Sequence, residues 1–224
     1  MTTLIHIEDD PLWACHVREL LTAWPEFRLL GTAATGASGL AHCRALSPHI
    51  VLLDMRLPDQ TGAELIDQLG AVRPPPRILL LTSCAGDGVL ARSEREPVAG
   101  MIWKTMNLNR ELREALSAVA RGHRHFSPEA LQALRRFRAA PGSYVKLLTT
   151  RELEALPHFV KGRIDGEVAS ALGCASATAH AHRKNVMQKL GVHSLAELQD
   201  WALRNDVFDI PRPAPPCAAS WLDL

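Results

Sequence analysis

The chain has 224 residues with a formal net charge of +1, and 47% of its residues are hydrophobic. This length accommodates two domains, each with its own core. The sequence contains no apolar run of about 18 residues and no signal-peptide pattern at its start, so we expect neither a membrane span nor a membrane partner. Its five scattered cysteines, without a Cys-x-x-Cys spacing, favour a reduced, cytoplasmic protein.

The first 120 residues alternate apolar runs with amphipathic segments, which predicts a parallel sheet covered by helices. Four of these runs, which we expect to be strands, are followed directly by polar residues. The polar residues are Glu8 and Asp9 after 5–7, Asp54 after 50–53, Thr82 after 78–81 and Lys104 after 101–103. Because the carboxyl ends of parallel strands meet at one edge of a sheet, we expect these side chains to converge.

Converging carboxylates, a hydroxyl and an ammonium suit phosphoryl transfer. Acidic oxygens hold hard divalent cations such as Mg²⁺, and a carboxylate can serve as the phosphoryl acceptor. A phosphohydrolase with an aspartate nucleophile is the alternative from another class, but it needs a second Asp two residues further on. Arg56 occupies that position, and the sequence has no glycine-rich phosphate loop, so we do not predict an enzyme.

The order and spacing of these residues, together with Leu57-Pro58-Asp59-x-x-Gly62, resemble the receiver domain of bacterial two-component response regulators. The resemblance implies a five-stranded parallel, doubly wound α/β domain over residues 1–120. It also implies that Asp54 accepts a phosphoryl group from a sensor histidine kinase, while Thr82 and Lys104 contact the phosphoryl oxygens. Magnesium would be held by Glu8, Asp9, Asp54 and the backbone carbonyl of Arg56, with Glu8 acting through water.

A basic linker is expected over residues 121–147. Residues 120–147 carry six Lys and Arg against one Glu, which is either a solvated helix face or a surface for phosphate groups. Ser127-Pro128-Glu129 predicts the start of a helix that ends near Ala140.

Residues 148–206 have the pattern of an all-α domain. Thr149-x-x-Glu152 and Ser194-x-x-Glu197 predict capping boxes at the starts of two helices. Between them, Asp165 is expected to cap a short helix that ends at Gly173, and a third helix follows from Ser176. A short helix, a tight turn and a polar helix are typical of a helix-turn-helix. The Pro-rich tail at 207–224 cannot continue a helix.

This region resembles the LuxR-type DNA-binding domain. The matching residues include Leu148-Thr149-x-Arg151-Glu152, Glu167-Val168-Ala169, Thr178, His182 and Lys189-Leu190-Gly191-Val192. A receiver followed by this domain is the NarL/FixJ class, which implies a homodimer on double-stranded DNA. The implied DNA contacts are Thr178, His180, Ala181, His182, Arg183 and Lys184, with His180 where the family usually has lysine. An output domain that binds protein rather than DNA remains the alternative function.

Helix periodicity separates two faces of the third helix. His180, Lys184 and Gln188 share one stripe, whereas Val186 and Leu190 are expected in the core. On the fourth helix, from Ser194 to about 205, Trp201 lies off the apolar stripe. We therefore expect Trp201 to be an exposed dimer contact.

Overall fold

The computed structural model describes residues 1–60, 62–83, 86–105, 108–205 and 207, so most of the predicted tail lies outside the described residues. These residues form two compact units. The first contains the described parts of Met1–Thr82 and Glu96–His125, and the second contains those of Ser83–Arg95 and the chain from Phe126 onward. No helix in the described part of the chain is long and apolar enough to cross a membrane.

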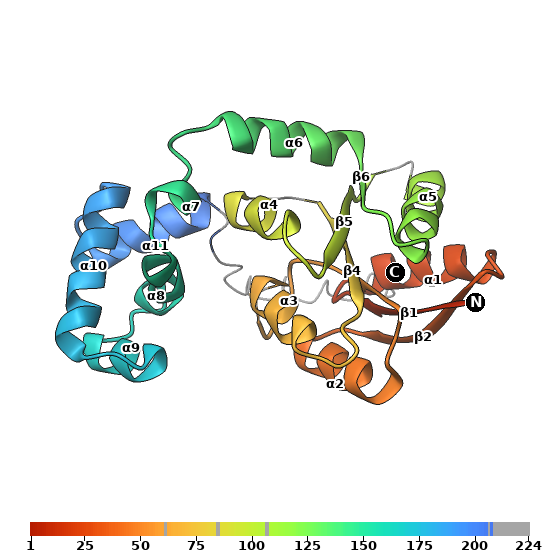
Figure 1. Ribbon diagram of the computed structural model, residues 1–224, viewed down its shortest axis with the longest axis horizontal. Coiled ribbons are helices and arrows are strands. Elements are labelled where there is room, and N and C mark those ends of the chain that lie inside the picture. Colours follow the sequence, from red (N-terminus) through yellow and green to blue (C-terminus); the bar gives the residue numbers. More distant parts are fainter. Residues whose placement is uncertain (61, 84–85, 106–107, 206, 208–224) are drawn as a thin grey trace, which may run out of the picture. The chain divides into compact units, whose positions relative to one another are not determined.

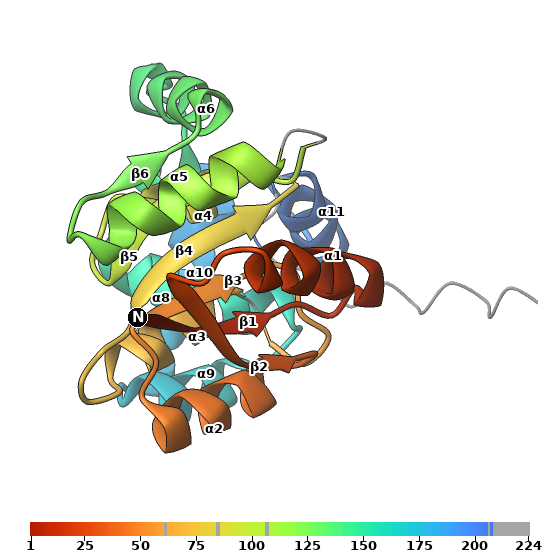
Figure 2. The ribbon, with the colours of Figure 1, turned by 90° about the vertical axis from the view of Figure 1, so that its right-hand side faces the viewer.

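The first unit is built on a sheet in the order β2-β1-β3-β4-β5-β6. The strands β1 to β5 run parallel; they are Thr2–Ile7, Phe27–Ala33, Ile50–Leu53, Arg77–Thr82 and Val98–Trp103. Helices α1 (Pro11–Thr22) and α5 (Leu108–Ala120) cover one face of the sheet, and α2 (Gly36–Leu46) and α3 (Gly62–Gly70) cover the other (Figures 1 and 2). This is the predicted α/β architecture.

The number of strands differs from the prediction, because the described residues form six strands rather than five. The sixth, β6 (His125–Phe126), follows α5 and lies at the β5 edge of the sheet. Gly100 in β5 makes this possible, since a Cβ there would lie only 2.0 Å from the carbonyl oxygen of His125. The apolar pattern could not reveal this strand, because it is two residues long and lies within the linker.

Two carboxylates fix the loops at the carboxyl edge of the sheet. The Asp10 carboxylate accepts from the backbone N of Leu12 at 2.8 Å and so caps α1, which begins at Pro11. The Asp59 carboxylate accepts from the backbone N of Gly36 and Ala37, at 2.8 and 2.9 Å. The loop between β3 and α3 is thereby tied to the start of α2.

The second unit is helical in its described residues. Its helices are α4 (Asp87–Ser93), α6 (Pro128–Ala139), α7 (Tyr144–Leu147), α8 (Thr150–Val160), α9 (Asp165–Leu172), α10 (Ser176–Leu190) and α11 (Leu195–Arg204). Ser127 caps α6, and Thr149 and Glu152 form a reciprocal capping box on α8, both as predicted. Buried side chains from α8 to α11, including Phe159, Val168, Val186 and Leu198, form the core of the helix-turn-helix.

The basic linker uses part of its charge within the second unit. Lys146 Nζ donates to the carbonyl oxygens of Phe137, Arg138 and Ala140, at 2.7, 2.9 and 2.8 Å. This ammonium group satisfies the carboxyl end of α6. Arg138 donates through Nε to the Glu94 carboxylate at 2.7 Å, which joins α6 to the segment after α4. Two of the linker's six cations therefore have partners within the second unit, although both residues are exposed.

Candidate functional site

Three acidic side chains meet at the carboxyl edge of the sheet. Glu8 and Asp9 follow β1 and Asp54 follows β3, and one carboxylate oxygen from each lies within 4.8 Å of the others. The backbone N of Asp54 donates to the carbonyl of Ile7 at 2.9 Å, so the pairing of β1 with β3 continues into the site. Glu8 and Asp54 are buried and Asp9 is exposed. The convergence predicted from the apolar runs is confirmed.

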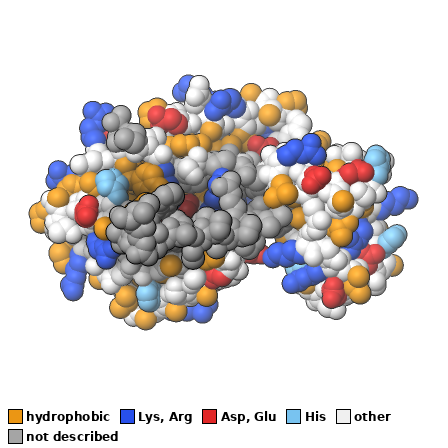
Figure 3. Space-filling view, turned by 180° about the vertical axis from the view of Figure 1, so that it is seen from behind, with side chains coloured by type: hydrophobic (Ala, Val, Ile, Leu, Met, Phe, Trp, Pro, Cys, Tyr) orange, Lys and Arg blue, Asp and Glu red, His pale blue; other side chains and the backbone are white. Residues whose placement is uncertain are grey.

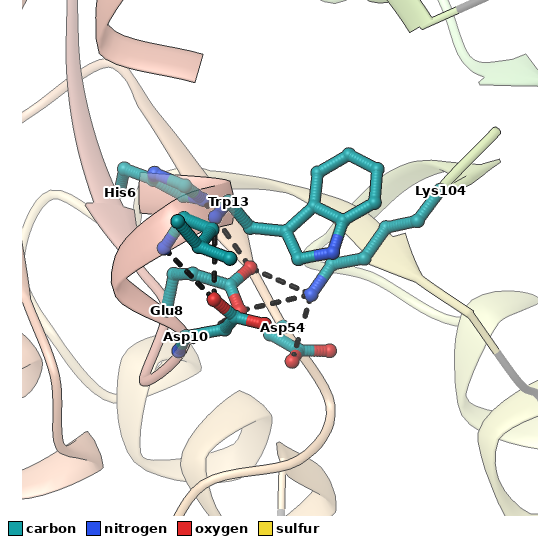
Figure 4. A network of polar contacts seen from close by, with 7 residues as sticks. His6, Glu8, Asp10, Trp13, Asp54 and Lys104 are labelled. Carbon is teal, nitrogen blue, oxygen red and sulfur yellow. Dashed lines mark hydrogen bonds and ion pairs between the residues drawn. The ribbon is translucent and has the colours of Figure 1, made fainter. Parts of the chain in front are cut away.

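Lys104, directly after β5, joins the acidic group (Figure 4). Its Nζ lies 3.0 Å from Oδ2 of Asp54, 2.9 Å from Oε1 of Glu8 and 2.7 Å from Oε2 of Glu8. The ammonium is also 5.5 Å from the centre of the Trp13 ring, which comes from the first turn of α1. A buried cation therefore bridges two buried carboxylates, with an aromatic face beside it.

Burial and mutual repulsion control the charges at this edge. Burial raises the pKa of Glu8 to about 7, repulsion from Asp54 adds to the rise, and Lys104 opposes it. Partial burial and Asp54 likewise raise the pKa of Asp9. His6 is the second-last residue of β1, and burial together with the charge of Lys104 lowers its pKa to about 3. Its neutral ring lies 3.7 Å from the Glu8 carboxylate.

The donor set suits a hard divalent cation, because three carboxylates offer oxygen and two of them have raised pKa values that a cation would lower. Arg56 lies two residues beyond Asp54 in the loop toward α3, with a half-buried side chain. Thr82 is the last residue of β4 and is buried, and its carbonyl accepts from the backbone N of Lys104 at 2.9 Å. The predicted hydroxyl and ammonium thus end neighbouring strands.

Helix α10 presents most of the predicted polar residues to solvent. Thr178, His180, Ala181 and Lys184 are exposed, as is Gln188 further along the same stripe. Val186 is fully buried and Leu190 packs partly against the core, as the periodicity predicted. Figure 3 shows basic, acidic and histidine side chains interspersed on the visible face of the second unit.

Two of the predicted residues contact α9 instead of lying free. Arg183 Nε donates to Oδ1 of Asp165 at 2.6 Å, and its guanidinium lies 4.5 Å from the centre of the Phe159 ring. His180 Nδ1 lies 2.9 Å from Oδ2 of the same carboxylate. Partial burial acts to raise the pKa of Asp165, but the hydrogen bonds from Arg183 and His180 lower it overall. The prediction that Asp165 caps α9 was wrong, because Ile164 is the N-cap and Asp165 is the first helical residue.

Comparison with known proteins agrees with this arrangement. Residues 4–117 match the response regulator receiver domain, and residues 146–202 match the bacterial regulatory proteins of the luxR family. The chain belongs to the response-regulator family. The transcriptional regulatory protein MctR of Rhizobium johnstonii is 32% identical to it over 201 residues, which are 90% of this chain and 92% of MctR. The response regulator VraR of Staphylococcus aureus is 26% identical over 205 residues, covering 92% and 98% of the two chains.

Solved structures of RcsB from Salmonella share the fold of this response regulator. RcsB of Salmonella enterica serovar Typhimurium, bound to the rprA promoter in the presence of BeF3⁻, is 24% identical with a TM-score of 0.64. That comparison covers 89% of this chain and 97% of RcsB. The same protein bound to the P1flhDC promoter gives 21% identity and a TM-score of 0.62, covering 92% and 99%.

The expected exposure of Trp201 was wrong, whereas its role as a dimer contact stays a prediction. Trp201 is half-buried and packs edge-to-face on Tyr144, with ring centres 5.3 Å apart. No sequence pattern indicated this contact, because Tyr144 lies in the short helix α7, which periodicity did not predict. The exposed apolar side chains of α11 are instead Leu195 and Leu203, which are 42% and 50% exposed. They are eight residues apart and share one face of the helix.

Sequence reasoning also missed two residues that contact the functional side chains. Trp13 lies over Lys104. Asp165 was interpreted as a helix cap, and it binds two side chains of α10. Both contacts are long-range, so no local pattern could reveal them. In the sequence, Trp13 is only an aromatic residue close to the acidic motif, and Asp165 is only an acid close to the helix-turn-helix pattern.

Proposed function

We propose that this response regulator takes a phosphoryl group on Asp54 from the phosphohistidine of a sensor histidine kinase. In this step the N–P bond of the donor breaks, and a bond forms between phosphorus and a carboxylate oxygen of Asp54. The contact that best supports the proposal is that of Lys104 with Asp54, at 3.0 Å on a sheet edge with two further acids. A fixed cation beside the acceptor favours the charge carried by the incoming group.

Glu8, Asp9, Asp54 and the backbone carbonyl of Arg56 would hold Mg²⁺, which neutralises charge on the phosphoryl oxygens when bound. Lys104 contacts both Glu8 and Asp54, so it would lie within reach of the oxygens of a phosphoryl group on Asp54. Thr82, at the end of the next strand, would supply a hydroxyl to the same oxygens. These roles require the three strand ends to stay in register. The continuous β3–β4 pairing supports this, as does the β4–β5 pairing, which is unbroken from Leu79 to Thr82 after one register shift.

We further propose that the phosphorylated protein binds double-stranded DNA as a homodimer in the cytoplasm, without turnover of a small-molecule substrate of its own. Helix α10 would enter the major groove through its exposed residues Thr178, His180, Ala181 and Lys184, with His182 at the margin. The divisions 1–120, 121–147 and 148–206 remain the proposed receiver, linker and DNA-binding segments. Arg183 would hold α10 against α9 rather than read bases, since its polar contacts lie within the domain.

Phosphorylation of the full chain with acetyl phosphate and Mg²⁺, measured by intact mass, tests the acceptor. The wild type should gain one phosphoryl group, and Asp54→Asn should gain none. Asp59→Asn is the matched control, because it neutralises an acid in the following loop and should label like the wild type. Equal labelling of Asp54→Asn and the wild type would reject Asp54 as the acceptor.

A further inference from the structure

The exposed stripe of α10 contains one side chain that a second helix holds in place. The His180 side chain is 70% exposed, yet its Nδ1 lies 2.9 Å from Oδ2 of Asp165 at the start of α9. Lys184, one turn further along the stripe, is exposed and has no such tether to α9 in the described part of the chain. The contact joins α9 and α10, the two helices of the helix-turn-helix, on their solvent-exposed side. A role for this contact in DNA recognition rests on the DNA binding proposed above.

The chemistry of this contact fixes the proton on the imidazole. An ionised carboxylate can only accept hydrogen bonds, so the hydrogen between the two groups belongs to Nδ1 of His180. In the neutral ring the other nitrogen, Nε2, then carries a lone pair and acts as an acceptor. No group among the described residues hydrogen-bonds Nε2. The contact with Asp165 thus selects one tautomer and limits rotation of the ring.

Asp165 is itself held firmly, which makes it a rigid support. Its other oxygen, Oδ1, accepts from Arg183 Nε at 2.6 Å, and Arg183 also donates to the backbone carbonyl of Arg163. The guanidinium packs over the ring of Phe159, which is fully buried. An exposed ion pair contributes little stability by itself. The effect of this pair is therefore the orientation of His180.

We propose that Asp165 is a positioning residue for base recognition, which presents Nε2 of His180 as an acceptor in the major groove. The groups that can donate to it there are the exocyclic amines of adenine (N6) and cytosine (N4). A side chain that only donates, such as lysine, would select the opposite chemistry, the O6 and N7 acceptors of guanine. His180 thus determines specificity at one base position, and Asp165 determines how His180 reads it.

Selection from a random duplex DNA library tests the proposal. The full-length protein, phosphorylated with acetyl phosphate, is used at mildly alkaline pH, where imidazole groups are neutral. The wild type should select a motif with adenine or cytosine preferred at one position of each half-site. Asp165→Asn can donate as well as accept, so it admits both tautomers. It should reduce that preference on the order of fivefold, at that position alone.

Four further variants show whether the effect acts through His180. His180→Ala should lose the same preference, and adding Asp165→Asn to it should change nothing more. His180→Lys should prefer guanine at that position. Glu167→Gln, which neutralises another acid of α9, should keep the wild-type motif. These preferences report on one base position, which a general loss of domain stability would not single out.

The outcomes separate this inference from the proposed function. If the wild type selects a motif and Asp165→Asn selects the same motif with equal strength, the positioning role is rejected while DNA binding stands. If the wild type selects no motif, the proposed function fails and this inference fails with it. Thermal unfolding checks each variant. Should Asp165→Asn not fold, an unchanged preference in His180→Ala, which alters an exposed side chain, rejects the inference.

Discussion

Replacing Lys104 with Met tests whether the acidic edge depends on its buried cation. The Lys104 side chain is 5% exposed, and its partners Glu8 and Asp54 are 0% and 8% exposed. Removing one member of a buried ion pair costs about 3–5 kcal/mol, because the remaining charge stays buried without a partner. Here two carboxylates remain, so the unfolding equilibrium should shift on the order of 10²-fold or more toward the unfolded state.

The size of this loss should depend on pH, since Glu8 can take up a proton. Its pKa is raised to about 7 from 4.5, so its contribution to stability is present below the unfolded value and is lost as pH rises through about 7. Lys104 opposes that rise. The variant should therefore lose more stability, relative to wild type, at about pH 8 than at about pH 6.

Urea denaturation followed by circular dichroism, in the presence of a chelator, measures both effects. Arg18→Met is the matched control, because it removes one positive charge from an exposed position of α1 and should change stability little. A Lys104→Met protein as stable as the wild type at the higher pH would show that Lys104 does not offset the buried charges of Glu8 and Asp54. An equal loss at the two pH values would contradict the pH dependence expected from Glu8.

Three further predictions concern the metal, the DNA and the dimer. Asp9→Ala should weaken Mg²⁺ binding, followed by tryptophan fluorescence with Trp13 as the nearby reporter; an unchanged affinity would place the metal elsewhere. Lys184→Ala should weaken binding to the selected operator by about 1–3 kcal/mol if Lys184 contacts a base, and unchanged affinity would remove it from the interface. Leu203→Glu should reduce the number of subunits bound per operator by disrupting an exposed apolar face of α11; wild-type stoichiometry in native mass spectrometry would exclude that face.

The receiver site could be predicted from the sequence because its residues follow apolar strands. A short apolar run of three or four residues indicates a buried parallel strand, and the next polar residue then lies at the carboxyl edge. Asp54 and Lys104 are 50 positions apart, and this rule still brings their side chains within 3.0 Å. The rule says nothing about which acid pairs with the lysine, and Glu8 shares it equally with Asp54.

The helix-turn-helix was predictable in its helices but less so in its contacts. The capping box of Thr149 and Glu152 is local, so it is visible in the sequence and is confirmed. At α11 only half of the predicted box forms, because Ser194 caps the helix but the Glu197 carboxylate accepts from the backbone N of His193. The direction of a long polar side chain depends on what lies across the turn. Arg183 packs inward because Asp165 and Phe159 face it, and Trp201 is half-buried because Tyr144 covers it.

Phosphorylation of Asp54 should control DNA binding. A gel-shift titration of the selected operator with the wild type and Asp54→Asn, each with and without acetyl phosphate, measures this control. Acetyl phosphate should tighten binding of the wild type and have no effect on Asp54→Asn. Equal operator affinity of the wild type with and without phosphorylation, with labelling of Asp54 verified by mass, would contradict this expectation.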